Sequence, residues 1–319
     1  MIRVGTNQTY QGLLLIGDPH LEGRIPGFRK DDYPQTVLGK LRFALAAARD
    51  HDLLPLVLGD LFHLPRNNPN WLLVEVMQLF SQDIAGIYGN HDVHENQLTD
   101  DDSLSVLAHA GRITLLDSDS YLDTVITGRR VVIGGTPWGQ RLPSRLCPEL
   151  QELGPELVLW LAHHDLIVPG YEDQGHFRPK ELPGIDLVVN GHIHRCLGKV
   201  QTGTTTWLTP GNISRRSRSD ATRAHCPSVL RLDATDQGWA PTWIEVPHQP
   251  FEDVFYEAVA EEEPGEGGSA FIAGLAELQA RKTQTGAGLT TFLNKNLSQF
   301  DPEVARHIRM LAEEVQGHE

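Results

Sequence analysis

The chain has 319 residues, of which 40% are hydrophobic and 22% charged, a composition typical of globular proteins that gives no support to wholesale disorder. Its formal net charge of -15 argues against a protein that coats nucleic acid through bulk electrostatics, because that mode needs Lys and Arg to displace counterions. Three widely spaced cysteines, no basic leader before an apolar stretch and no apolar run of membrane-spanning length predict a cytoplasmic protein without disulfides and without membrane contact.

The first half of the chain alternates short apolar runs with longer stretches of helical periodicity. Apolar runs at 13–16, 54–58 and 84–88 predict strands, and helices are expected between them at 34–49 and 71–80. Strands this apolar are normally covered by helices or sheets on both faces. They indicate an α/β core in which functional groups collect beyond the carboxyl ends of the strands.

Beyond residue 112 the pattern changes to paired β runs. Two hairpins are predicted, 121–127 against 130–134 and 197–201 against 204–208. Apolar runs at 158–162 and 186–189 lie between them, and 228–232 and 242–246 would add late strands. The predicted fold class is α/β, a layered β-sandwich flanked by helices.

The C-terminal part of the sequence differs from the rest. From Phe251 to Glu319 there are 13 acidic residues and 5 Lys or Arg, and residues 261–268 are rich in Glu, Gly and Pro, as linkers are. Beyond this linker, apolar residues at 304, 308, 311 and 315 predict an amphipathic helix, for which packing on its own domain and docking on a partner are equally open. We therefore expect a core over 1–248 and an acidic linker with a helical or capping segment over 249–319.

Metal-ligand side chains recur where the predicted strands end. Each motif is weak alone, because Asp at a strand end is often a turn residue and a single His is often a packed core residue. The ordered set is specific, because a strand end holds a side chain on rigid backbone while pointing it into a cleft. The motifs are Asp18-Pro19-His20, Gly59-Asp60, Gly89-Asn90-His91-Asp92, His163-His164 and Gly191-His192-Ile193-His194.

The mixture of carboxylate and imidazole donors indicates the kind of metal. Borderline divalent ions such as Mn, Fe and Zn accept both donor types, whereas an all-oxygen shell would suit Mg or Ca. We expect two divalent ions, with Mn first among Mn, Fe, Zn, Co and Ni.

From about residue 13 to about residue 212 the order and spacing of these motifs resemble the calcineurin-like metallophosphoesterase superfamily. Three segments are similar to its DNA-repair nuclease branch, which includes the bacterial SbcD subunit: Gly59-Asp60-Leu61-Phe62-His63, residues 182–186 leading into 191–194, and Thr209-Pro210-Gly211-Asn212. The resemblance implies that one metal is held by Asp18, His20 and His194 and the other by Asn90, His163 and His192, with Asp60 bridging both. His163 is preferred to His164 because superfamily members with paired histidines here use the first.

The resemblance also implies catalytic roles. His91 would face the scissile phosphate as general acid or electrostatic stabiliser, with Asp92 orienting its ring, while His63 and Asn90 would contact the substrate. In this hypothesis a hydroxide between the two ions attacks phosphorus in line.

DNA is the expected substrate of the leading hypothesis. Arg195, Arg215 and Arg216 follow the ligand motifs and are expected to border the cleft and contact phosphates, although a solvated basic loop is an equal alternative. An SbcC-like ATPase or a helicase is a possible partner type, and the oligomeric state is left open. The other hypotheses are hydrolysis of a small phosphoester (a cyclic nucleotide, dinucleotide or phosphoprotein) and, with less support, a non-catalytic scaffold.

Overall fold

A computed structural model of the chain describes residues 1–6, 9–169, 171, 172, 175–256 and 306. The chain divides into two units, Met1–Tyr256 and Glu257–Glu319. The first unit extends past residue 248, because helix α6 (Phe251–Val254) is followed by a bridge between Phe255 and Arg29. The expected linker and amphipathic helix lie, except for Arg306, outside the described residues.

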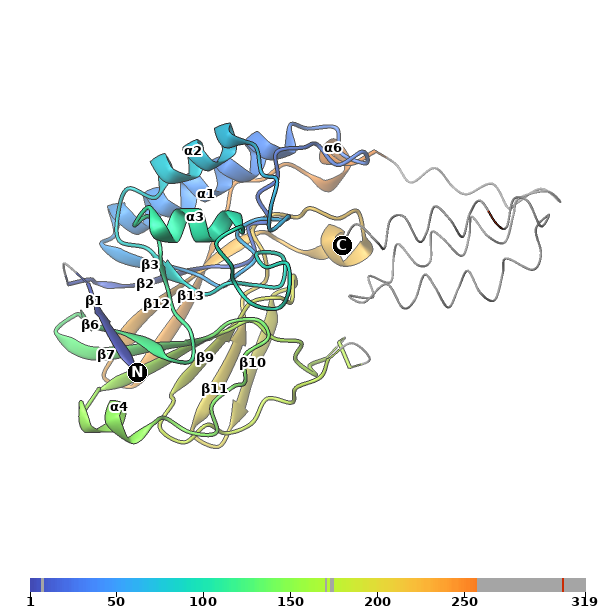
Figure 1. Cartoon of the computed structure of the whole chain (residues 1–319). Coiled ribbons are helices and arrows are strands. Elements are labelled where there is room, and N and C mark those ends of the chain that lie inside the picture. Colours follow the sequence, from blue (N-terminus) through green and yellow to red (C-terminus); the bar gives the residue numbers. More distant parts are fainter. Residues whose placement is uncertain (7–8, 170, 173–174, 257–305, 307–319) are drawn as a thin grey trace. The chain divides into compact units, whose positions relative to one another are not determined.

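Two mixed sheets form the frame of the first unit (Figure 1). The six-stranded sheet has the order β13-β12-β2-β3-β4-β5, with the strands Gly238–Glu245, Ser228–Thr235, Gly12–Ile16, Leu53–Val57, Ala85–Gly86 and Thr114–Leu115. The seven-stranded sheet has the order β1-β6-β7-β8-β9-β11-β10, with the strands Ile2–Gly5, Ser120–Ile126, Arg129–Thr136, Leu157–Ala162, Leu187–Asn190, Thr205–Thr209 and Leu197–Thr202.

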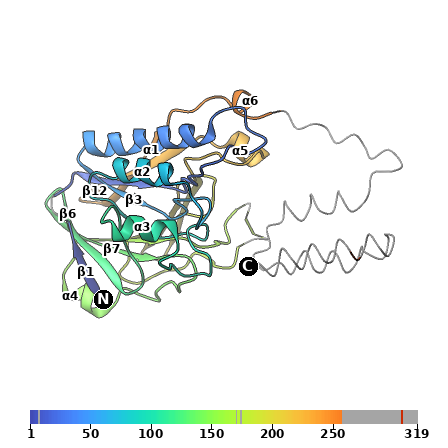
Figure 2. The same ribbon diagram turned by 45° about the horizontal axis from the view of Figure 1, so that its top comes forward.

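Helices flank this pair of sheets. Helices α1 (Tyr33–Asp50), α2 (Asn70–Leu79) and α3 (Ser103–His109) lie together over the six-stranded sheet, while α4 (Pro148–Glu152) lies by the seven-stranded one (Figure 1). The short helix α5 (Asp220–Ala224) lies near α6 at one end of α1 (Figure 2). Helix α1 begins where the carboxylate of Asp32 accepts a hydrogen bond from the backbone N–H of Gln35 and a proline occupies its first turn.

The alternation of side chains along each strand separates three apolar layers. On β2, Leu13 and Leu15 face the space between the sheets, whereas Leu14 and Ile16 pack against the helices. A third layer on the outer face of the seven-stranded sheet includes Trp207. Both faces of the central strands are thus buried, which explains why the sequence shows unbroken apolar runs there.

The predicted α/β sandwich is confirmed. The apolar runs form β2, β3, β4, β8 and β9, and both predicted hairpins are present as β6–β7 and β10–β11. Strand β4 is shorter than expected, with only Ala85 and Gly86 in the ladder. Among the described residues, no helix combines the length and the apolar character that crossing a bilayer requires.

Candidate metal centre

The metal-ligand motifs follow parallel strands in both sheets and lie close together. In the six-stranded sheet β2, β3 and β4 run parallel, and Asp18, Asp60 and Asn90 lie in the loops after them. In the other sheet β8 and β9 run parallel, and His163 and His192 follow them. The carboxyl ends of these parallel strands thus bring the two sets of candidate ligands to one place.

The loops that carry the ligands have unusual backbone conformations. Asp18, His20, Asp60 and His192 all have positive φ, at 39°, 47°, 49° and 69°. This left-handed region is costly for residues other than glycine, and it persists where surrounding structure enforces it, which is common at functional sites. Gly89 is needed for a different reason, because a Cβ atom there would overlap the carboxylate of Asp60.

The first ligand group combines His20, His194 and Asp60. The Nε2 atoms of His20 and His194 lie 2.9 Å apart, and Nε2 of His20 lies 3.5 Å from Oδ2 of Asp60. Burial lowers the pKa of both imidazoles, to about 3 for His194 and well below the ordinary value for His20. Both rings are therefore neutral at neutral pH and present lone pairs, as metal-binding imidazoles do.

The second group combines His163, His192 and Asn90 around the same aspartate. Nε2 of His163 lies 3.5 Å from Oδ2 of Asp60 and 3.3 Å from Oδ1 of Asn90, and Nδ1 of His192 lies 2.9 Å from that amide oxygen. Oδ2 of Asp60 is therefore equally far from an imidazole of each group. A carboxylate oxygen in this position is suited to bridge two ions.

The structure also separates His163 from its neighbour His164. Nδ1 of His163 donates to the carbonyl oxygen of Leu58 at 2.7 Å, which fixes the tautomer and leaves Nε2 toward Asp60. The ring of His164 lies instead 5.2 Å from that of Phe177. His163, and not His164, therefore lies beside Asp60 and Asn90, and its role as a ligand stays a prediction.

These residues fit a pair of divalent cations. Nε2 of His192 lies 2.5 Å from a carboxylate oxygen of Asp165, so Nε2 carries the proton of the ring. The lone pair of Nδ1 then faces a lone pair of the Asn90 side-chain oxygen. Among the described residues, Oδ2 of Asp18 and Nδ1 of His20 are buried without a hydrogen-bond partner. Facing lone pairs and an orphaned carboxylate oxygen are both unfavourable without a cation and favourable with one.

The charges of the carboxylates lead to the same conclusion. Burial and the nearby charge of Asp60 raise the pKa of Asp18 to about 7, against an opposing effect of His163. For Asp60 burial also favours the neutral form, but His163 and His91 outweigh it and hold the pKa well below its ordinary value. Asp60 is thus an anion, and a divalent cation would return Asp18 to its charged form.

His91 and His63 lie next to the ligands. Their rings stack at 4.8 Å, and that of His91 also meets the ring of His20 at 4.8 Å. Nδ1 of His91 donates to the carbonyl oxygen of His63 at 2.9 Å, so Nε2 is the atom that would exchange a proton with a substrate. Both residues are in position to approach a phosphate held by the metals.

The contacts of Asp92 differ from the expected ones. Its oxygens accept hydrogen bonds from the backbone N–H groups of Gly89, Leu61 and Phe62, at 2.9, 3.2 and 2.9 Å. Asp92 therefore ties the loop after β3 to the loop after β4, and the orienting contact of the His91 ring that the structure records is to His63.

The three arginines expected at the cleft lie in different surroundings. Arg195 lies over the ring of Tyr171, with the guanidinium carbon 5.2 Å from its centroid. Arg216 forms an ion pair with Glu22 at 2.8 Å, and Glu22 lies two residues after His20. Arg215 does not border the cleft: it is only 5% exposed and donates to the backbone oxygen of Gln249, because its loop turns this side chain toward α1.

Two residues of the site were not predicted from the sequence. Asp165 contacts Nε2 at the edge of the His192 ring, and the indole of Trp138 stacks on a face of that ring with centroids 5.1 Å apart. A carboxylate two residues after His163 is a signal that could have found Asp165. No comparable signal marks Trp138, which reaches the site from the loop after β7.

A comparison with known proteins identifies the family of the chain. The family model for calcineurin-like phosphoesterases matches residues 13–196, while no curated protein matches significantly. A hypothetical protein from Thermus thermophilus is 13% identical, covers 74% of this chain and 99% of its own, and has a TM-score of 0.44. A predicted phosphoesterase from Streptococcus pneumoniae is 12% identical, with coverage of 77% and 95% and a TM-score of 0.33. The chain belongs to the calcineurin-like phosphoesterase family and is a metal-dependent phosphoester hydrolase.

Proposed function

We propose that this hydrolase is a Mn-dependent DNA nuclease of the SbcD-like branch that cleaves phosphodiester bonds at a two-metal centre. The observation that carries the two-metal part is the position of Asp60, whose Oδ2 lies 3.5 Å from an imidazole of each ligand group. Two bound divalent ions would supply a nucleophile at neutral pH and neutralise charge on the phosphate. The mixed His, Asp and Asn donors fit Mn, as they also fit Fe and Zn.

The side chains around the ligands provide the remaining functions. Stacking against His63 and the hydrogen bond to its carbonyl fix the ring of His91, so that Nε2 would donate a proton to the departing oxygen. Asp92 fixes the backbone between Asp60 and His91, and Asp165 fixes the ring of His192. The protein thus sets the positions of ligands and proton donor before substrate arrives.

The support for DNA is the motif at 59–63 together with the place of its histidine. His63 stacks directly on His91 and would lie beside the same phosphate. Arg195 follows His194 directly in the sequence, and Arg216 contacts Glu22, which lies two residues after His20. These two arginines are the cations that would contact neighbouring phosphates of a strand. A cytoplasmic location and an ATPase or helicase partner remain predictions that accompany this proposal.

A small phosphodiester is the second candidate substrate. Glu22 already neutralises Arg216, and Arg215 faces away from the site, so the rim is less basic than the sequence indicated. A long polyanion gains most of its affinity from such a rim, whereas a small ester depends on the metals alone.

The test compares both substrates on one protein. Purified protein loaded with Mn is incubated with labelled single-stranded DNA, double-stranded DNA and bis-p-nitrophenyl phosphate, with Asp60→Asn as the inactive control. We expect cleavage of DNA that depends on Mn and falls with added salt, and a larger loss of DNA cleavage than of ester hydrolysis in His63→Gln. Hydrolysis of the ester without any cleavage of DNA would reject the nuclease and keep the hydrolase.

A further inference from the structure

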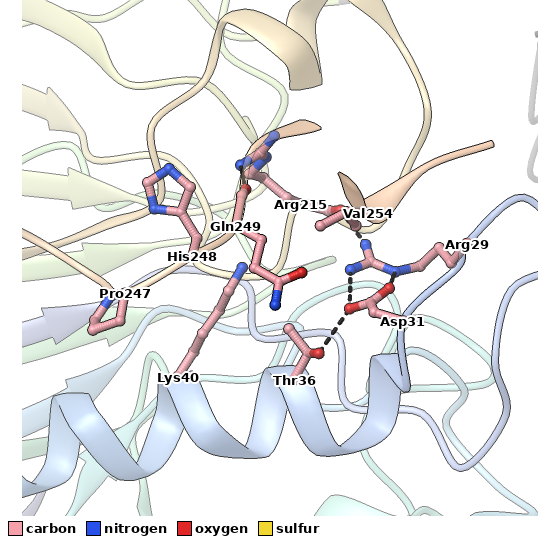
Figure 3. A pocket seen from close by; sticks show the side chains of 9 residues that line it. All are labelled: Arg29, Asp31, Thr36, Lys40, Arg215, Pro247, His248, Gln249 and Val254. Carbon is pink, nitrogen blue, oxygen red and sulfur yellow. Dashed lines mark hydrogen bonds and ion pairs between the residues drawn. The ribbon is translucent and has the colours of Figure 1, made fainter. Parts of the chain in front are cut away.

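A second group of charged residues lies away from the metal ligands. Lys40 on α1, Arg29 before it and Arg215 line a cavity of about 340 Å³ together with Asp31 and Gln249 (Figure 3). This volume lies within the range of about 300–1,000 Å³ that is usual for small-molecule sites. Lys40 and Arg29 are each 4% exposed and Arg215 is 5% exposed, so three cations are almost completely buried around one cavity.

Only one of these cations has a carboxylate partner in the cavity. Arg29 forms a bidentate pair with Asp31, with both N···O distances 2.8 Å, and donates its remaining amino group to the backbone oxygen of Arg215. Both carboxylate oxygens of Asp31 therefore accept hydrogen bonds from Arg29, and one of them also accepts a hydrogen bond from Thr36. The nearby carboxylate of Glu252 pairs with Arg223. Asp31 and Glu252 lie near enough to raise the pKa of Lys40 and Arg215, respectively, but neither cation forms an ion pair of its own in the part of the chain that the structure describes.

Lys40 and Arg215 also keep donors for a ligand. Lys40 donates to the carbonyl oxygens of Ile213 and Ser214, at 2.8 and 3.3 Å, which uses two of its three N–H groups. Arg215 donates from Nη1 to Gln249, while its Nε is buried and has no hydrogen-bond partner among the described residues. An unpaired buried donor on a cation is costly, and an anion in the cavity would satisfy it.

The mutual repulsion of the cations favours an anion as well. Burial, together with the charges of Arg215 and Arg29, lowers the pKa of Lys40 to about 7. Burial and Arg29 also lower the pKa of Arg215. A bound anion would relieve both effects, since it favours the charged form of each group.

We propose that this cavity binds a small tetrahedral oxyanion between Lys40 and Arg215, either inorganic phosphate or the phosphoryl group of a small phosphomonoester. Figure 3 shows Lys40 reaching from α1 toward Gln249, with Arg215 coming from a separate loop. Donors that approach from different elements match an anion with acceptor oxygens in several directions. The site is independent of the metal ligands and does not rest on the proposed nuclease activity.

Titration calorimetry of inorganic phosphate into the full-length, metal-stripped protein tests the site. We expect saturable binding of one phosphate per chain that weakens about tenfold or more in Lys40→Met, because a charge-assisted contact is lost. Gln249→Glu, at an exposed position of the cavity wall, should weaken it similarly by repulsion and carries little risk of misfolding. Arg49→Met is the matched control, since Arg49 lies on the same helix with its side chain 66% exposed.

Three results would overturn the proposal: no saturable heat, equal affinity in all variants, or an affinity that falls in His192→Ala but not in Gln249→Glu, which would place the anion at the metal centre. Glycerol phosphate distinguishes the two sources of the anion. If it binds more tightly than inorganic phosphate and depends on Lys40, the ligand is a phosphomonoester; if it binds more weakly with the same dependence, the ligand is free phosphate.

Discussion

The contact between Asp165 and His192 shows how single residues prepare the metal centre. The imidazole has two nitrogens, and either could carry the proton in a free ring. A carboxylate oxygen 2.5 Å from Nε2 assigns the proton to that atom and points Nδ1 at Asn90. The stacked indole of Trp138 limits rotation of the same ring. His192 is therefore held in its ligating tautomer and orientation before any metal arrives.

Replacing Asp165 with Asn tests this arrangement. The change keeps the size of the side chain and removes the charge, so we expect Mn affinity to fall about 10–100-fold, as for other residues that orient a ligating histidine. Equilibrium dialysis measures the affinity, and hydrolysis of bis-p-nitrophenyl phosphate should recover at high Mn. Asp50→Asn makes the same change at an exposed position at the end of α1 and should leave Mn binding unaltered. Unchanged Mn affinity in Asp165→Asn would show that His192 does not depend on this carboxylate.

Short-range patterns in the sequence point to the candidate ligands but not to the residues that hold them. Asp18, Asp60 and His163 each follow an apolar strand within a few positions, so short-range pattern is enough to find them. The contacts of Asp92 and Trp138 depend on loops from other strands that meet only in the folded protein. The orientation of Arg215 is likewise set by the cavity under its loop, which no local pattern indicates.

At the scale of elements, length and burial decided which predictions succeeded. Helix α1 has a strong helical repeat and strand β3 an unbroken apolar run, and both were predicted within a residue or two of their ends. Strand β1 was missed because its residues are exposed or half-buried and show no apolar run. Helices α3 and α4 are too short to develop a helical repeat, and their positions depend on packing against the sheets.

Helix α1 contains a glycine that offers a test of element stability. Gly39 lies in the helix interior, and an added Cβ would meet nothing within 4 Å. Because glycine loses more backbone entropy on folding than alanine, Gly39→Ala should raise the free energy of unfolding by about 0.5–1 kcal/mol. Urea denaturation followed by circular dichroism measures the change. Gly89→Ala is the opposite case, since its Cβ would overlap Asp60 and should impair Mn binding. A decrease in stability for Gly39→Ala would contradict the helical assignment of this position.

At the scale of the whole molecule, the metal centre depends on the packing of one sheet against the other. One sheet supplies Asp18, Asp60 and Asn90, and the other supplies His163 and His192. The layer between the sheets is apolar and includes Leu15, buried against partners from both. Distances between the two halves of the site are thus set by core packing, which tolerates little change in volume.

The first structural unit contains every residue assigned to the metal centre and ends at Tyr256, whose backbone N–H donates to the carbonyl oxygen of Phe28 at 3.1 Å. A chain that stops after Tyr256 should therefore fold and bind Mn like the full chain, and should hydrolyse bis-p-nitrophenyl phosphate with an unchanged kcat/KM. Residues 257–319 contribute much of the negative charge, so their removal should also increase the rate of DNA association at low salt. Circular dichroism, dialysis against Mn and hydrolysis rates of the two chains provide the comparison. Loss of ester hydrolysis in a folded, Mn-loaded short chain would show that the C-terminal unit contributes to the active site itself.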